Sequence, residues 1–141
     1  MKALLISSIA AVTKMLLSIG FPQSVAVTGK LTCNGKPVAN AKVELYDLEV
    51  LVDQVLAQGF SNSEGVFYLT GRKGELSSID PKVYILHRCN YDGNFTDSCY
   101  KKLSFEVPKN FVTKGSTPTK VFNIGHIKLA GEFSEDTSCI K

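Results

Sequence analysis

The 141-residue sequence has few of the groups that usually hold a metal or carry out catalysis. Histidine occurs only at His87 and His126, and the four cysteines include no Cys-x-x-Cys pair. A zinc site would therefore have to draw its ligands from scattered positions instead of the usual close pairs. The serines also lack the sequence context of a nucleophile elbow. These absences favour a protein with no metal, no cofactor and no catalytic residues.

A strong charge of one sign is also missing, and so is any nucleic-acid-binding motif. The chain carries 16 Lys and Arg against 13 Asp and Glu, for a net charge of +3. Without residues 1–26, which contain two lysines and no acid, 14 basic residues face the same 13 acids and leave +1. Nothing in this balance favours nucleic acid as a partner.

Residues 1–26 have the character of a secretory signal peptide. They read MKALLISSIAAVTKMLLSIGFPQSVA, with Lys2 ahead of a long apolar stretch. Lys14 leaves about a dozen apolar residues on either side, fewer than the ~20 that a membrane-spanning helix needs. Small residues permit cleavage after residue 20 or after residue 26, and both sites remain open. We expect a secreted, extracellular protein whose folded domain covers 27–141.

The four cysteines are expected to form disulfides, because a secreted chain folds in an oxidising compartment. They are Cys33, Cys89, Cys99 and Cys139, and four cysteines allow three pairings. Asp92-Gly93, a turn signal, lies between Cys89 and Cys99. This predicts that Cys89 and Cys99 pair across a hairpin. Cys33 would then pair with Cys139 and tie the first strand to the C-terminal tail.

Beyond residue 26, apolar and polar residues alternate between turn signals, as in antiparallel strands. The predicted strands lie within 25–33, 41–46, 58–61, 66–70, 82–89, 100–107 and 121–130. The turn at 62–65 predicts a hairpin between the strands on either side of it. About seven short strands and no convincing amphipathic helix predict an all-β, two-sheet antiparallel sandwich.

Several runs taken together closely resemble the transthyretin-like family of secreted nematode proteins. They are GKLTCNGKP (29–37), VELYD (43–47), SNSEGVFYLTG (61–71), IDPKVYILHRC (79–89), FEVPKNFVTKG (105–115) and FNIGHIKLA (122–130). The resemblance covers essentially the whole chain after residue 26. It implies a transthyretin-like sandwich of the immunoglobulin-like class, secretion, and two disulfides in the arrangement given above.

The apolar-rich stretch at 48–56 departs from that pattern, where a polar connection is expected. We interpret it as an additional strand or a buried helical turn. The alternative is an exposed apolar patch that joins subunits or a partner. The sequence leaves the oligomeric state open.

Transthyretin relatives include an enzyme, 5-hydroxyisourate hydrolase, whose site resembles a cluster of histidines, an arginine and a C-terminal Tyr-Arg-Gly-Ser. Here the C-terminal residues read TSCIK, and the first strand has no histidine. His87 and His126 lie on separate predicted strands, where local hydrogen bonding is commoner than general-base catalysis. We therefore predict that the chain is not an enzyme, and the hydrolase remains a remote alternative.

Two surface features suggest modification and binding. Asn94-Phe95-Thr96 is a glycosylation sequon at the predicted hairpin tip, so a glycan is expected at Asn94. Five lysines and one acid fall between residues 100 and 120. We interpret these lysines as a binding surface, and the alternative is that they form an ordinary solvated face. Two of them, Lys101 and Lys102, are adjacent on a strand and should point to opposite faces. The expected centre of the binding surface is Lys109, Lys114 and Lys120, with Phe111 beside them.

These features together predict a secreted extracellular binding or adaptor module. Its partner is expected to be an extracellular protein, cell-bound or soluble, or an anionic cell surface. The alternative is a carrier of a small hydrophobic ligand at an oligomer interface. Similarity to the transthyretin fold suggests that carrier role, but no residue of this chain establishes it.

Overall fold

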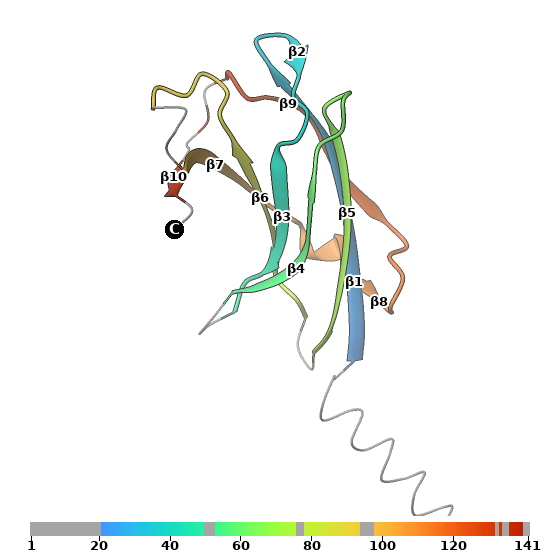
Figure 1. Ribbon diagram of the computed structural model, residues 1–141. Helices are drawn as coiled ribbons and strands as arrows, with labels where there is room; N and C mark the ends of the chain where they lie inside the picture. Colours follow the sequence, from blue (N-terminus) through green and yellow to red (C-terminus); the bar gives the residue numbers. More distant parts are fainter. Residues whose placement is uncertain are drawn as a thin grey trace, which may run out of the picture.

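The computed structural model describes residues 21–49, 53–75, 78–93, 98–131, 133 and 136–139, which form a β-sandwich of two sheets (Figure 1). In the first sheet β1 is central: one of its sides pairs with β5 and β2, and the other with β8 and β9. These strands are β1 (Phe21–Cys33), β2 (Lys36–Pro37), β5 (Val66–Glu75), β8 (Thr113–Lys114) and β9 (Val121–Lys128). The second sheet has the order β10-β7-β6-β3-β4. Its strands are β3 (Lys42–Asp47), β4 (Gln54–Phe60), β6 (Pro81–His87), β7 (Cys99–Glu106) and β10 (Asp136–Cys139).

The all-β, two-sheet prediction is confirmed, with two differences in detail. The described part of the chain contains ten strands where about seven were expected. The three extra strands, β2, β8 and β10, are too short to show an alternating pattern in the sequence. The pairing of β1 with β9 is parallel, and all the other ladders are antiparallel. A short 3-10 turn, η1 (Lys109–Phe111), precedes β8.

The core lies between the sheets and follows the alternation seen in the sequence. Val25 and Val27 of β1 face Leu45 of β3 and Ile85 of β6, and these side chains are fully buried. Burying each such side chain contributes about 1.5–3 kcal/mol of transfer free energy. The period-two pattern therefore identified the inward faces of the strands.

The first strand begins six residues before the expected domain boundary at residue 27. Residues 21–26 pair with β5, and Ser24, Val25 and Ala26 are fully buried. The Gln23 side chain accepts a hydrogen bond from the Ile79 N–H at 2.9 Å. The first half of β1 is thus an integral part of the first sheet.

We expect signal cleavage after Gly20 and not after Ala26. Cleavage after residue 26 would remove half of β1 and expose the core around Val25, whereas cleavage after residue 20 leaves the strand complete. N-terminal sequencing of the secreted protein is expected to read FPQSV. A mature chain starting at Val27 would contradict this prediction. Residues 1–20 lie outside the described part of the structure.

The hairpin predicted around the turn at 62–65 is wrong. β4 pairs with β3 in the second sheet and β5 pairs with β1 in the first, so the turn carries the chain from one sheet to the other. Gly65 has a φ of +80°, and its carbonyl accepts a hydrogen bond from the Leu31 N–H at 2.8 Å. Apolar alternation is satisfied by burial in either sheet, so it does not reveal the partner strand. The hairpin of β6 and β7 is confirmed, with Val83 opposite Phe105.

Part of the apolar stretch at 48–56 forms the additional strand that the sequence suggested. Residues 54–56 begin β4, where Leu56 packs against the core and Val55 stays 50% exposed. Residues 50–52 lie outside the described part. Within the described ranges, no helix has the length and apolar character of a membrane span.

Candidate binding surfaces

Two disulfides fix the structure at the Cys33 end of β1, and they pair the cysteines differently from the prediction. Cys33 is bonded to Cys89, with Cα atoms 5.7 Å apart, and Cys99 is bonded to Cys139, with Cα atoms 3.9 Å apart. The predicted pairs, Cys89 with Cys99 and Cys33 with Cys139, are therefore wrong.

The neighbours of each strand explain this pairing. β6 ends at His87, so Cys89 lies beyond the sheet and meets Cys33 at the end of β1 in the opposite sheet. Cys99 lies directly opposite Cys139 in the ladder of β7 and β10. Sequence reasoning identified the β6–β7 hairpin but missed β10 on the other side of β7. β10 has four residues, Asp136–Cys139, and the cysteine at its end is the feature of its sequence that could have indicated a partner for β7.

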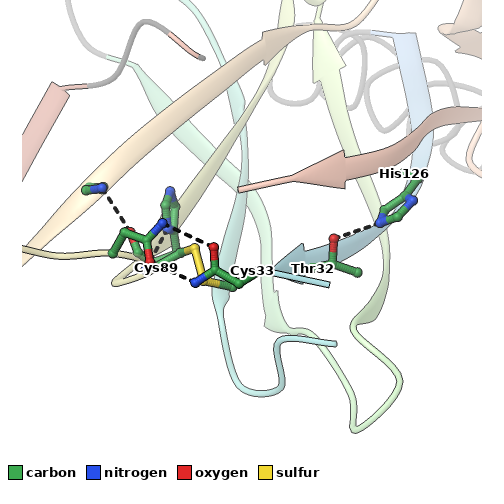
Figure 2. The surroundings of a disulfide bond; sticks show 8 residues. Thr32, Cys33, Cys89 and His126 are labelled. Carbon is green, nitrogen blue, oxygen red and sulfur yellow. Dashed lines mark hydrogen bonds between the residues drawn. A yellow bond between two sulfur atoms is a disulfide. The ribbon is translucent and has the colours of Figure 1, made fainter. Parts of the chain in front are cut away.

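The two histidines lie on different sheets, and each makes a local hydrogen bond. His87 is 3% exposed, and its Nδ1 accepts from the Cys89 N–H at 3.1 Å. His126 is exposed on β9, and its Nε2 lies 2.7 Å from Thr32 Oγ1, away from the disulfide (Figure 2). Among the described residues, no cluster of three His, Cys, Asp or Glu side chains could hold a metal.

The lysines at 109, 114 and 120 lie on one exposed segment that folds back on itself. We call residues 108–120 the basic loop; it contains these three lysines and no acid. Lys120 Nζ donates to the Asn110 carbonyl at 3.0 Å. The Thr119 N–H donates to Thr113 Oγ1, also at 3.0 Å. These contacts bring the two ends of the basic loop together, with the lysines exposed along it.

Phe111 holds the basic loop against the sandwich. Its ring centroid lies 5.0 Å from that of Phe122 on β9, and its half-buried side chain packs against the core. A contribution of Phe111 to partner binding stays a prediction, because the ring has an intramolecular partner.

The other two lysines diverge as expected for neighbours on a strand. Lys101 donates to the Cys89 carbonyl at 2.9 Å, and Lys102 Nζ lies 4.1 Å from the centroid of the Tyr84 ring. Neither belongs to the basic loop. The predicted glycan site falls at 94–96, and residues 94–97 lie outside the described part.

The outer face of the second sheet carries aromatic side chains that contact one another. Tyr46 meets Tyr84 edge-on, with centroids 5.2 Å apart. The Tyr46 hydroxyl donates to a carboxylate oxygen of Glu44 at 3.2 Å. Burial, and then the nearby negative charge of Glu44, raise the pKa of Tyr46. Tyr46 therefore stays a neutral donor, and its contacts are internal to the face.

A concave site, which we call the end groove, lies beside the Cys33–Cys89 disulfide and has a volume of about 600 Å³. Leu86 and Ala41 are buried in its lining, and Phe60, at the end of β4, is 63% exposed. Its cations are Lys42 and Arg88. Sequence reasoning missed this site, because its lining comes from positions between 33 and 100 that only the fold brings together.

Comparison with known proteins gives a consistent result. The transthyretin-like family profile matches residues 28–108. Three similar curated proteins come from Caenorhabditis elegans. Transthyretin-like protein 33 is 44% identical over 85% of this chain and 84% of its own, transthyretin-like protein 5 is 39% identical over 86% and 88%, and transthyretin-like protein 2 is 34% identical over 86% and 86%. A solved 9R-lipoxygenase chain from Cyanothece covers 76% of this chain at 15% identity with a TM-score of 0.39, a likeness too slight to bear on function.

Proposed function

The chain belongs to the transthyretin-like family, and on that premise we propose that it is a secreted, non-enzymatic binding module. Its partner is an extracellular protein with an acidic surface or an anionic cell surface, and contact is made through the basic loop. The observation that carries this proposal is the closure of the loop by the Lys120–Asn110 and Thr113–Thr119 hydrogen bonds. Because these bonds link residues on both sides of the turn at 114–118, the segment folds back on itself, and Lys109, Lys114 and Lys120 are all exposed on it.

The charge and the rigidity of the basic loop support this role. Each lysine near an anionic headgroup layer contributes about 1 kcal/mol of attraction. The loop is anchored by Phe111 on Phe122 and by the pairing of β8 with Gln23 and Ser24 of β1. A segment held in this way loses less conformational entropy on binding than a free loop does.

The positions of the histidines support the non-enzymatic part of the proposal. His87 is buried and receives the Cys89 N–H, whereas His126 is exposed and sits beside Thr32. A general base and its helper need hydrogen-bond reach of one reacting group. These two side chains come from opposite sheets and have separate local partners.

Replacing Lys109, Lys114 and Lys120 together by glutamine is expected to weaken binding to vesicles of phosphatidylcholine with phosphatidylglycerol by more than about tenfold. The salt dependence of binding should also flatten, because three charges are lost from the contact. Vesicle co-sedimentation over a range of salt concentrations measures both effects, and an acidic protein partner, once identified, can replace the vesicles.

The matched control replaces three other exposed lysines, Lys30, Lys36 and Lys128, by glutamine. Both triple variants have the same net charge, so a specific site predicts a loss only in the basic-loop variant. Thermal unfolding should change little in both, since none of these six side chains is buried, although the basic-loop variant loses the hydrogen bond from Lys120 Nζ to the Asn110 carbonyl. Equal losses in the two variants, or no loss in either, would exclude the basic loop as the contact.

A further inference from the structure

We propose that the end groove binds a small amphipathic carboxylate, with its apolar body on the groove floor and its carboxylate between Lys42 and Arg88. This site is separate from the basic loop. The basic loop adjoins Gln23 and Ser24 at the start of β1, whereas the end groove adjoins Cys33 at the end of the same strand. The proposal thus goes beyond the function proposed above.

The apolar part of the ligand is indicated by the floor and walls. Leu86 is only 6% exposed although it lies on the outward-facing row of β6, between the inward-facing Ile85 and His87. Phe60 from β4 and Tyr100 from β7 add aromatic side chains to the lining. A volume of about 600 Å³ lies within the range of sites that bind small molecules.

The walls of the end groove are fixed before any ligand arrives. Ser61 Oγ accepts from the Ala41 N–H at 3.0 Å and donates to the Val38 carbonyl at 2.6 Å, which ties down the chain before β3. The Cys33–Cys89 disulfide, which also lines the end groove, crosses between the sheets. A preformed site loses little conformational entropy on binding.

The charge of the ligand is indicated by the two cations. Lys42 and Arg88 belong to the lining, which includes no Asp or Glu among the described residues. The Arg88 guanidinium lies 4.5 Å from the centroid of the Tyr100 ring and 5.5 Å from that of Tyr91, so the aromatic rings hold it in place. No described acid forms an ion pair with Lys42. A carboxylate would accept a charge-assisted hydrogen bond from Lys42, and the guanidinium of Arg88, which keeps its own contacts, would add positive charge beside it.

The test compares two probes with alkyl tails of nearly equal length and opposite charge, decanoate and decyltrimethylammonium, added to the ¹⁵N-labelled protein. Decanoate is expected to shift the amide resonances of residues 39–42 and 86–89 and to bind about tenfold more tightly than the cation. Phe60→Ser should weaken both probes without loss of stability, because the ring is mostly exposed. Lys42→Glu should weaken decanoate about tenfold and favour decyltrimethylammonium.

The control is Lys30→Glu, which makes the same charge change on an exposed residue of the other sheet and should leave decanoate binding unaltered. Equal affinity for the two probes, shifts confined to other regions, or equal effects of Lys42→Glu and Lys30→Glu would each overturn the proposal. The basic-loop triple variant should still bind decanoate, so failure of one proposal can be told apart from failure of the other.

Discussion

Replacing Cys33 and Cys89 together by alanine is expected to lower the free energy of unfolding by about 4 kcal/mol. The disulfide joins residues 56 apart in the sequence, so in the chain-entropy model it restricts the unfolded chain strongly. It also links the end of β1 in the first sheet to the segment after β6 in the second. Cys89 is 7% exposed and packs in the core, so its loss also removes buried contacts.

The second disulfide provides a matched comparison. Cys99 and Cys139 are 40 residues apart and join neighbouring strands at one edge of the second sheet. The double alanine variant of this pair is expected to lose slightly less, about 3–4 kcal/mol, because loop closure contributes nearly as much but little core contact is lost. Guanidinium unfolding of both variants measures the difference. A larger loss for the Cys99–Cys139 pair would contradict the dominant role of the disulfide between the sheets.

Peptide mapping without reduction tests the pairing itself. In the Cys33→Ala, Cys89→Ala variant, the remaining cysteines are expected to form the Cys99–Cys139 bond in full, because they already face each other in a strand ladder. In the wild-type protein, a peptide containing Cys33 should be recovered bonded to one containing Cys89. Recovery of a Cys89–Cys99 peptide would restore the hairpin pairing that the sequence suggested.

The substitution Asp47→Asn is expected to lower the free energy of unfolding by about 2–3 kcal/mol. Asp47 is 1% exposed, and its carboxylate lies 3.2 Å from Lys73 Nζ. It also accepts the Asp80 N–H at 2.8 Å. Asparagine keeps the volume and an acceptor for Asp80, but it removes the negative charge beside Lys73. The loss therefore reports mainly the buried charge pair.

Glu49→Gln is the matched control, because Glu49 contacts the same lysine at a more exposed position. The side chain of Glu49 is 31% exposed, against 2% for Asp47. Solvent screening reduces the contribution of such a pair to about 0.5 kcal/mol or less. Urea unfolding of both variants at neutral pH gives the comparison. Similar losses would show that burial does not strengthen the Asp47–Lys73 pair.

The sequence by itself determined the fold class and the inward faces of most strands. Alternation is a local property, so the inward rows of β6 and β7, which include Val83 and Leu103, were readable without knowledge of their neighbours. The Asp92-Gly93 turn signal likewise predicted that these two strands pair. The sequence placed the three lysines of the basic loop between the predicted strands, whereas the structure places Lys114 in the short strand β8 and bonds Lys120 to Asn110.

Only the tertiary structure decided which elements are neighbours. β4 and β5 have the same alternation whether they pair with each other or lie in separate sheets, and the structure separates them. Cys89 and Cys99 have partners in segments far along the chain, which no local signal names. The end groove depends on these same long-range choices. Local patterns fix which face of a strand is buried, whereas strand order is set by the packing of the whole core.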